Sequence, residues 1–300
     1  MRLRGILLVN KPTTLTSYDV IRKLKSIFPK NKIGHAGTLD PIADGLLLIL
    51  FNEATKIAQY LSSADKEYVA KIRLGIITDT DDITGKIIAQ KEPLNITIDQ
   101  IENGLSLLAG KKEQIPPRFS ALKLEGKRAY KLARQGIDFT LKPRPVNIKS
   151  IAVVDFSQPT LTIKLTVSTG TYIRAIARDL GEILGCGATL QNLTRIKIGK
   201  FSLANAINLA EINPKNIHDH LQPINEALAE LSAITANQKQ LKKLLNGQPI
   251  LFDQDDYLKN GTSTVRIIDD ENRMLILAKI KNNKIYPMRV IYADLSAKTE

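Results

Sequence analysis

The chain has 300 residues, 43% of them hydrophobic, and a formal net charge of +13. This length suits about two domains of roughly 100–200 residues each, and the apolar content excludes an intrinsically disordered chain. The single cysteine, Cys186, excludes a disulfide framework within the chain. This cysteine content fits a cytoplasmic setting, which we expect for the protein, and no segment approaches the roughly 18 apolar residues of a membrane span.

The N-terminal part of the sequence alternates short apolar runs with helical patterns. The run over 6–9 predicts a buried strand, and the run over 46–51 predicts another. A helix is expected over 16–28, beginning with a capping box that includes Asp19. A further helix is expected over 53–61.

A glycine-rich loop, 34–47, lies between these two apolar runs. It contains three glycines and one proline, and it displays His35, Asp40 and Asp44. Irregular loops that are fixed to a buried element carry function more often than structure. This loop is therefore the first candidate for a functional site.

The middle of the chain begins with an alternating pattern over 68–76, which predicts a strand that Tyr68 opens. The aspartate-rich stretch 78–85 resembles a calcium loop in composition. Its glycine stands one place late and no glutamate follows at the right distance, so we interpret it as a turn. A helix is expected over 97–108, followed by an extended proline-containing stretch.

The segment 123–149 is the most basic part of the chain. It holds eight Lys and Arg against two acids, with Tyr130 and Phe139 among them. Together with the net charge, this indicates contact with the phosphates of a nucleic acid. The alternatives are a solvated lysine-rich helix face and a basic protein that lysine merely keeps soluble.

The next part of the sequence predicts a strand over 161–167, a helix that ends near Leu184 and a strand over 193–198. Arg174 and Arg178 are four residues apart on that helix and so share a face.

A polar connector, 213–223, contains His218 and His220. With three histidines and one cysteine in the whole chain, it is not expected to bind a metal. A helix is expected over 224–231, and 232–237 is the expected domain boundary. Beyond it, the pattern predicts a short helix and a small β-rich module, with elements over 238–245, 265–268, 274–281 and 286–292.

Several cofactor-binding and catalytic motifs are absent from the sequence. It has no phosphate-binding loop of the Gly-x-x-x-x-Gly-Lys-[Ser/Thr] type and no dinucleotide fingerprint. It also lacks the zinc deaminase signature and the Gly-x-Ser-x-Gly motif. We therefore expect no nucleotide, metal or flavin cofactor, and any catalysis must come from ordinary side chains.

The loop segments Gly34-His35-Ala36-Gly37-Thr38-Leu39-Asp40-Pro41 and Gly45-Leu46-Leu47 resemble the catalytic loop of TruB-type tRNA pseudouridine synthases, of the bacterial stand-alone type. The resemblance covers about 5–230, and the weaker remainder to about 293 is similar to a PUA RNA-binding module. Further matching motifs follow in order: Asn10-Lys11-Pro12 with Thr16-Ser17, Lys66-Glu67-Tyr68, Arg73-Leu74-Gly75, Thr78-Asp79-Thr80-Asp81, Ser120-Ala121-Leu122-Lys123, Gly126-Lys127, Ala133-Arg134-Gln135-Gly136, Gly170-Thr171-Tyr172-Ile173-Arg174, Asp179-Leu180-Gly181 and Leu193 with Arg195.

The resemblance implies an α+β fold in two parts. A pseudouridine synthase core over 1–232 would contain a mixed, mainly antiparallel sheet flanked by helices, with the basic RNA-binding insert at about 123–149. A small, mostly-β PUA-like module would occupy 237–293.

The resemblance also implies the reaction. Uridine at position 55 in the T-arm of tRNA would become pseudouridine, because its uracil is detached at N1, rotated and rejoined through C5. No cofactor is needed, since there is no net redox change or hydrolysis. The implied partner is tRNA, with no membrane and no obligate protein partner, and the chain would be a monomer.

The resemblance assigns roles to four residues. Asp40 would be the nucleophile, attacking either the ribose C1′ or the uracil C6, and Arg174 would pair with it and keep it ionised. Tyr68 would stack on the target base and help to remove the C5 proton. His35 would wedge into the RNA and hold the place of the extruded uridine, whereas Asp44 is interpreted as local turn chemistry.

A second group of residues would contact the RNA. For Lys11, bracing of the catalytic loop is the alternative role. The group comprises Lys11, Tyr172, Leu193, Lys123, Lys127 and Arg134.

Two rival functions remain open at this point. A non-catalytic tRNA-binding or RNA-folding protein explains the charge, but not the presence of Asp40, Tyr68 and Arg174 in matching motifs. A hydrolase with an aspartate nucleophile that acts on a small molecule explains Asp40, but not the basic segment.

Overall fold

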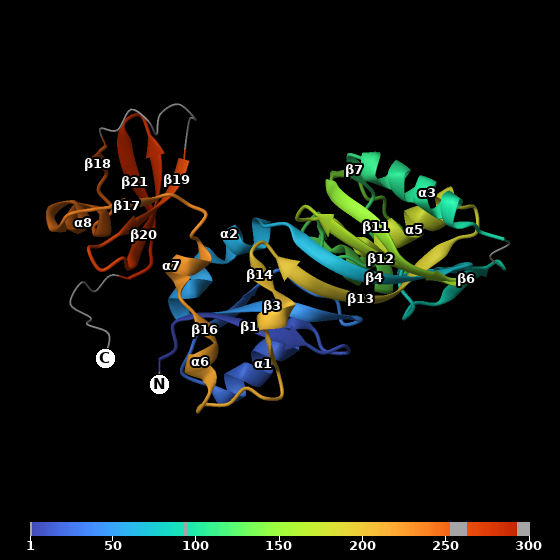
Figure 1. Cartoon of the computed structure of the whole chain (residues 1–300), viewed down its shortest axis with the longest axis horizontal. Helices are drawn as coiled ribbons and strands as arrows, with labels where there is room; N and C mark the ends of the chain where they lie inside the picture. Colours follow the sequence, from blue (N-terminus) through green and yellow to red (C-terminus); the bar gives the residue numbers. More distant parts are fainter. Residues whose placement is uncertain (1, 93–94, 253–262, 293–300) are drawn as a thin grey trace.

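The computed structural model describes residues 2–92, 95–252 and 263–292, and its centre is a long, mixed sheet (Figure 1). Neighbouring strands are antiparallel except in the pairs β1–β15 and β13–β3. The predicted α+β class, with a mixed, mainly antiparallel sheet flanked by helices, is confirmed. The strand order is β11 (Ile148–Ser157), β12 (Thr160–Val167), β4 (Lys66–Leu74), β13 (Ala188–Ile198), β3 (Ala43–Phe51), β1 (Gly5–Lys11) and β15 (Ile207–Asn208); β2 (Ile33–Ala36), β14 (Phe201–Ser202) and β16 (Leu221–Gln222) pair at its margins.

Strand β3 lies in the interior of this sheet and is buried on both faces. Successive side chains of a strand point to opposite faces, so Leu46, Leu48 and Leu50 pack into one apolar cluster while Leu47 and Ile49 pack into another. This explains why the strand is a continuous apolar run rather than an alternating one. The glycine-rich loop is thereby anchored to the best-buried strand of the core.

Helices cover the sheet on the sides that its apolar side chains require. α1 (Ser17–Ile27) begins at the predicted capping box, in which Asp19 N donates to Thr16 Oγ1 at 3.0 Å. α3 (Ile98–Gly110) and α5 (Ile173–Ile183) pack on each other and on the face formed by β12, β4 and β13. The remaining helices are η1 (Asn52–Ile57), α2 (Ala58–Ser63), α4 (Ala129–Arg134), η2 (Leu203–Asn205), α6 (Ile217–His220), α7 (Ile224–Ala227) and α8 (Gln238–Leu245).

Two predicted helices differ from the structure. The helix expected over 53–61 is divided into the 3₁₀ helix η1 and the short helix α2. The helix expected over 224–231 is wrong in length, since α7 ends at Ala227. Leu228 has φ −111° and ψ 23°, and the chain continues as turns in which Leu231 N donates to Leu228 O at 2.9 Å.

Several strands were not predicted, because their sequences lack an apolar alternation. β2 contains part of the glycine-rich loop, and β11 is an edge strand with much of its length exposed. The hairpin of β5 (Ile76–Thr78) and β6 (Ile87–Gln90) lies on either side of the aspartate-rich turn.

The basic segment 123–149 folds into short elements of its own. A hairpin of β8 (Lys123–Leu124) and β9 (Lys127–Arg128) leads into α4, and β10 (Arg144–Pro145) pairs with β7 (Glu113–Gln114). Because such short elements bury little apolar area, the segment contributes mainly an exposed basic surface.

The C-terminal module forms a separate five-stranded sheet at one end of the molecule (Figure 1). β17 lies within the expected connector 232–237 and pairs with β19. Of the predicted module 237–293, residues 253–262 and 293 lie outside the described residues. The sheet has the order β17 (Ala233–Thr235), β19 (Ser263–Ile268), β20 (Met274–Lys281), β21 (Lys284–Val290) and β18 (Ile250–Leu251).

The module packs directly against the core. Met274, Leu277 and Ile291 belong to the same apolar cluster as the side chains on one face of β3, and Lys56 Nζ donates to Val290 O at 2.6 Å. The position of the module is therefore fixed relative to the sheet. Within the described ranges, no helix has the length and apolar character needed to cross a membrane.

Candidate active site

A pocket of about 320 Å³ opens where the glycine-rich loop meets the start of α5. Its wall combines the loop, the stretch 119–121 that leads into the basic segment, the turn before α5 and side chains from β4 and β13. It therefore collects residues from segments that are far apart in the sequence. The lining includes Gly37, Thr38, Leu39, Asp40, Ser62, Lys66, Tyr68, Phe119, Ser120, Ala121, Ser168, Thr169, Gly170, Thr171, Tyr172, Ile173, Arg174, Leu193 and Arg195.

Asp40 and Arg174 form an ion pair inside this pocket, with Oδ2 and Nη2 2.9 Å apart. The Asp40 side chain is 42% exposed, whereas that of Arg174 is 7% exposed. The carboxylate of Asp40 is thus accessible from the pocket, and it is paired with a buried guanidinium.

The environment of Arg174 fixes its guanidinium in place. Nη1 donates to Thr80 O at 3.0 Å and Nη2 donates to Phe119 O at 3.1 Å. The carboxylate of Asp82 lies 3.6 Å from Nη1. With these partners on its other sides, Arg174 presents one edge to Asp40.

The aspartate-rich turn therefore holds Arg174 in place through Thr80 O and the Asp82 carboxylate. It was interpreted as a turn, and the structure agrees, since Asp81 N donates to Thr78 O at 3.4 Å and Gly85 N donates to Asp82 O at 3.1 Å. Arg178 adds a second anchor, because its Nη1 lies 3.1 Å from Asp81 Oδ2. Burial raises the pKa of Asp81 to about 6, although the charge of Arg178 opposes this rise.

The loop that carries Asp40 is fastened at several points. Leu39 N donates to Ser17 Oγ at 2.8 Å, and Thr14 N donates to Pro41 O at 2.7 Å. Gly45 has φ +97°, and a Cβ there would lie 2.4 Å from Arg195 O. Only glycine fits this close backbone approach, so the loop has to enter β3 in this one conformation.

Lys11 braces the same loop from inside the protein. Its side chain is fully buried, and Nζ donates to Pro12 O at 2.8 Å and Leu15 O at 2.7 Å. Burial lowers the pKa of Lys11 to about 8, against the opposing charges of Asp44 and Asp40. This position favours the bracing role over direct contact with RNA.

Tyr68 lies at the start of β4, as predicted, and its side chain lines the pocket while being 8% exposed. In the sheet it stands opposite Leu165 on one side and Arg195 on the other. It therefore lies on the pocket wall close to Asp40 and Arg174, where an inserted base could stack on its ring.

Arg195 is the largest fully buried side chain of the described residues, and its sequence context did not mark it as a site residue. It donates to Leu46 O, Thr38 O and Gly37 O at 2.8, 3.2 and 3.0 Å. Hydrogen bonds from a charged donor contribute about 1.5–3 kcal/mol each. Three such hydrogen bonds can offset the cost of several kcal/mol for burying the charged guanidinium of Arg195.

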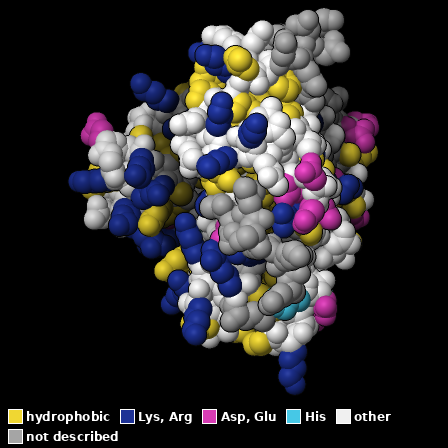
Figure 2. Space-filling view, turned by 90° about the vertical axis from the view of Figure 1, so that its left-hand side faces the viewer, with side chains coloured by type: hydrophobic (Ala, Val, Ile, Leu, Met, Phe, Trp, Pro, Cys, Tyr) yellow, Lys and Arg dark blue, Asp and Glu magenta, His cyan; other side chains and the backbone are white. Residues whose placement is uncertain are grey.

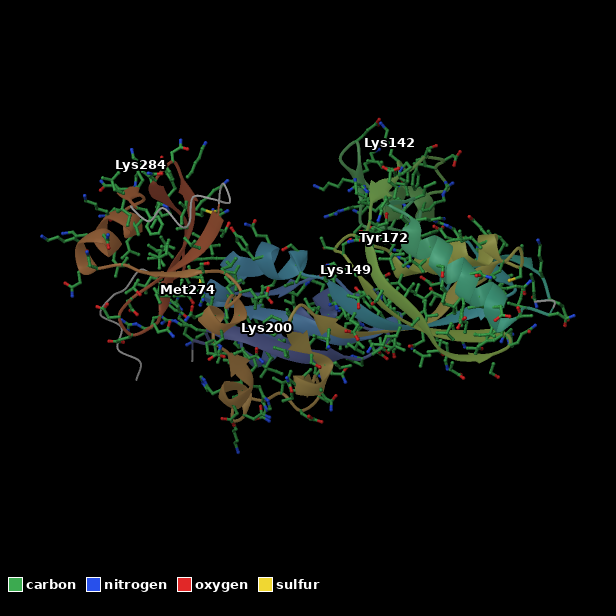
Figure 3. All side chains as sticks on the ribbon, turned by 45° about the horizontal axis from the view of Figure 1, so that its top comes forward. Lys142, Lys149, Tyr172, Lys200, Met274 and Lys284 are labelled. Atoms are coloured by element: carbon green, nitrogen blue, oxygen red, sulfur yellow. The ribbon has the colours of Figure 1, made fainter. Side chains whose placement is uncertain are left out.

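Tyr172 and Leu193 also line the pocket. The backbone of Tyr172 is held by Gln114, whose Oε1 accepts from Tyr172 N at 2.9 Å. Burial raises the pKa of the Tyr172 phenol and the charge of Asp40 adds to this, whereas Ser120 opposes it. In the view of Figure 3, Tyr172 lies below Lys142, which belongs to the basic segment.

His35 is not among the lining residues. It lies on β2, and its Nδ1 atom is buried without a hydrogen-bond partner. Burial lowers the pKa of His35, and the charge of Arg195 lowers it further. Asp44 is likewise absent from the lining, and its Oδ1 atom is buried without a hydrogen bond.

Lys123, Lys127 and Arg134 are exposed on the basic segment. The Arg134 guanidinium lies 5.7 Å from the centre of the Tyr130 ring. Because Phe119, Ser120 and Ala121 line the pocket directly before Lys123, this segment continues outward from the pocket wall. The structure therefore brings the basic surface to the pocket entrance.

Four residues of this arrangement were not proposed from the sequence. Lys66 and Arg195 stood in quoted motifs, and Ser120 stood in another, but nothing in their local pattern marked them as pocket residues. Asp82 was assigned to a turn. Their positions depend on strand pairing between distant segments, which periodicity alone does not reveal.

Solved structures show which class of protein has this fold. Over 96% of this chain, it superposes on 85% of a chain in "Crystal Structure of a Cbf5-Nop10-Gar1 Complex", with a TM-score of 0.73 at 22% identity. "Structure of H/ACA RNP bound to a substrate RNA containing 2'-deoxyuridine" gives a TM-score of 0.71 at 21% identity over the same shares of the two chains. The core thus has the pseudouridine synthase fold, as predicted.

Sequence comparison narrows this class to one family. Residues 25–173 match the TruB family pseudouridylate synthase N-terminal domain, 174–229 match the tRNA pseudouridylate synthase B C-terminal domain, and 232–291 match the C-terminal region of pseudouridine synthase II TruB. The chain belongs to the TruB family of pseudouridylate synthases. The predicted family and enzyme class are confirmed.

Curated relatives cover nearly the whole chain. The tRNA pseudouridine synthase B of Thermotoga maritima is 36% identical over 94% of this chain and 92% of its own length. That of Francisella philomiragia is 38% identical over 98% and 97%. That of Clostridium kluyveri is 42% identical over 81% and 84%.

Proposed function

We propose that this enzyme converts uridine to pseudouridine in tRNA, at position 55 of the T-arm, with Asp40 as the nucleophile. The observation that carries the proposal is the Asp40–Arg174 ion pair inside a pocket that Tyr68 also lines. The TruB relatives are named for this chemistry on tRNA. The position in the T-arm is what the resemblance of the catalytic loop implies.

The arrangement of the pocket supports a reaction that needs only side chains. Asp40 is exposed to the pocket and its carboxylate is oriented by Arg174, so it can add to the ribose C1′ or to the uracil C6. Tyr68 offers a ring on which the uracil stacks and a hydroxyl for the proton at C5. Tyr172 and Leu193 would close the remaining sides around the base.

A nucleotide can enter the pocket only after it has left the base stack of the RNA. His35 would occupy the place that the uridine vacates in the RNA. This role requires the imidazole to act outside the pocket, and His35 lies on β2 and is not among the lining residues. The buried Nδ1 atom without a partner gives a hydrogen-bonding group that RNA could use after a local rearrangement.

The charge distribution suits a folded polyanion. Lys and Arg side chains gather mainly on the left of the face shown in Figure 2, and Asp and Glu mainly on its right. Near the pocket, the exposed residues Lys123, Lys127 and Arg134 add positive charge shortly after the lining residues 119–121. RNA helices are recognised by shape and phosphate contacts, so such a surface would grip the T-arm without reading its sequence.

We further infer that the enzyme works as a single chain in the cytoplasm. This chain itself supplies Asp40, Tyr68 and Arg174 to the pocket, although a structural relative is titled as a complex with other proteins. Sedimentation of the purified chain while it turns over tRNA tests this directly. Activity that appears only after another protein is added would contradict it.

The decisive experiment is tritium release from a T-arm stem-loop that carries 5-tritiated uridine. The wild type should release tritium, and Asp40→Asn should release none above background. Asp44→Asn is the matched control, because it changes a carboxylate four residues away in the same loop and should keep most of the activity. Tight RNA binding without any tritium release by the wild type would support the non-catalytic alternative instead.

A further inference from the structure

Arg195 is a buried cation directly below the loop that carries Asp40. Its guanidinium donates to the carbonyl oxygens of Gly37 and Thr38 in that loop, and to Leu46 O in the strand that follows. The side chain is 1% exposed and still lines the pocket. It therefore touches the loop on one side and the pocket on the other.

Arg195 also lacks an acidic partner. Among the described residues, no carboxylate oxygen lies within 4.0 Å of its guanidinium, whereas Arg174 and Arg178 both have carboxylates at such distances. An arginine in a buried position is normally paired with an acid. Backbone carbonyl oxygens take the place of a carboxylate around this guanidinium, so its task is to fix the position of those carbonyls.

The second contact of Arg195 is with Tyr68. The two residues stand directly opposite each other on neighbouring antiparallel strands, so their side chains share a face. Burial lowers the pKa of the Arg195 guanidinium, and the neighbouring Tyr68 phenol opposes this fall because it favours the charged form. One side chain thus contacts the tyrosine of the pocket wall and the backbone of the catalytic loop.

We propose that Arg195 is a positioning residue for the isomerisation, which fixes the Tyr68 hydroxyl relative to the loop that carries Asp40. This inference rests on the proposed function, because it assigns the buried Arg195 guanidinium a task in that reaction. Lysine cannot replace it, since one ammonium cannot donate in the fork geometry that reaches three carbonyls and a phenol. Arg195 acts through Tyr68 and the loop, and not by contact with the reacting atoms.

A double-mutant cycle tests this coupling. The first-order rate of tritium release would be measured at saturating T-arm stem-loop for wild type, Arg195→Lys, Tyr68→Phe and the double variant. We expect Arg195→Lys to lower the rate about 100-fold, as a misplacement of about 1 Å can, and Tyr68→Phe to lower it about tenfold or more. The double variant should fall within about threefold of Arg195→Lys, because the hydroxyl is already misplaced.

A separate control keeps general destabilisation apart from positioning. Arg266 also donates to backbone carbonyls, at 2.8 Å to Leu231 O and 3.2 Å to Asn225 O, but it lies in the C-terminal module. Arg266→Lys should leave the first-order rate within about twofold of wild type. The RNA dissociation constant should also change by less than about threefold in Arg195→Lys, since the variant loses geometry and not the RNA-facing surface.

The outcomes decide the proposal. If the rate loss of the double variant equals the product of the two single-variant losses, Arg195 does not act through Tyr68, and the proposal is overturned. Full activity of Tyr68→Phe would overturn it as well, and this single variant decides the matter if Arg195→Lys does not fold. An inactive wild type would refute the proposed function and this inference together, whereas an active wild type with multiplying losses would refute the inference alone.

Discussion

Asp40 Oδ2 and Arg174 Nη2 lie 2.9 Å apart, on two segments that the fold brings together from opposite sides of the pocket. Asp40 belongs to the loop that leads into β3, and Arg174 belongs to the first turn of α5. The loop and the helix are thus two halves of one cleft. Their relative position decides whether the carboxylate can reach a base.

Removal of the Arg174 side chain is expected to abolish most turnover while the protein still folds. Arg174→Ala leaves Asp40 without its orienting partner, for which we expect a loss of about 100-fold or more in the rate of tritium release. It also leaves the buried Asp82 carboxylate without a cation at 3.6 Å, so the free energy of unfolding should fall by about 3 kcal/mol. Chemical denaturation and single-turnover assays measure the two effects.

The matched control for this prediction is Arg22→Ala. Arg22 also pairs with an aspartate, but its side chain is 68% exposed, and exposed pairs contribute about 0–1 kcal/mol. Both its activity and its stability should stay near wild type. Near wild-type turnover of Arg174→Ala would show that the pair is not needed for the reaction.

Replacement of His35 should affect RNA binding more than chemistry. His35 lies outside the pocket lining, so His35→Ala should weaken RNA binding by about tenfold, corresponding to about 1.4 kcal/mol. The first-order rate on bound RNA should change less than this. Equal affinity with a slower chemical step would instead place the imidazole at the reacting base.

The salt dependence of RNA binding should identify the phosphate-contacting lysines. For Lys123→Ala combined with Lys127→Ala, the slope of log K against log salt concentration should decrease in magnitude by about 1.4–1.8, since each of the two phosphate contacts contributes about 0.7–0.9. Lys215→Ala, an exposed lysine between β15 and α6, should leave the slope unchanged. A slope that is the same in all three proteins would contradict the proposed RNA surface.

Lys11 should make stability depend on pH above neutrality. Its folded-state pKa of about 8 lies below the ordinary value of 10.5, so the unfolded chain binds more protons between these two pH values. The contribution of Lys11 to the free energy of unfolding therefore rises from pH 8 to 10.5, by about 3 kcal/mol. Below pH 8 this contribution is lost, because the buried ammonium is charged in both states.

The comparison that isolates this effect is Lys11→Met. The difference in unfolding free energy between wild type and variant should shift in favour of wild type as the pH is raised, measured by urea denaturation at pH 7.5, 9 and 10. Other lysines and tyrosines titrate equally in both proteins and cancel. A difference that does not change with pH would mean that Lys11 keeps its ordinary pKa in the fold.

The sequence predicted those parts of the fold that have a strong local pattern. The capping box at Thr16 and Asp19, the apolar run of β3 and the alternation of β4 all depend on neighbouring residues, and the structure contains each of them. β11 was missed because an edge strand with one exposed side has no clear alternation. β2 was missed because its glycine and histidine indicate a loop.

The candidate site divides in the same way. Asp40, Tyr68 and Arg174 could be named because each stands in a motif of the family, and the structure places all three on one pocket. Arg195 and Asp82 could not be assigned, because their roles arise from strand register and from a turn that folds back onto α5. Lys11 was named for RNA contact, but burial beneath the loop favours its alternative role as a brace.

The origin of the pocket wall has a consequence for altering the enzyme. Tyr68, Leu193 and Arg195 are rungs of adjacent strands in the central sheet, whereas Phe119, Ser120 and Ala121 belong to the chain that enters the basic segment. The pocket residues on β4 and β13, where the reaction would occur, and the basic segment, which would select the RNA, therefore lie in different stretches of the chain. We expect that exchange of the basic segment for one of another shape would direct the same reaction to a different RNA, while Tyr68, Leu193 and Arg195 stay unchanged.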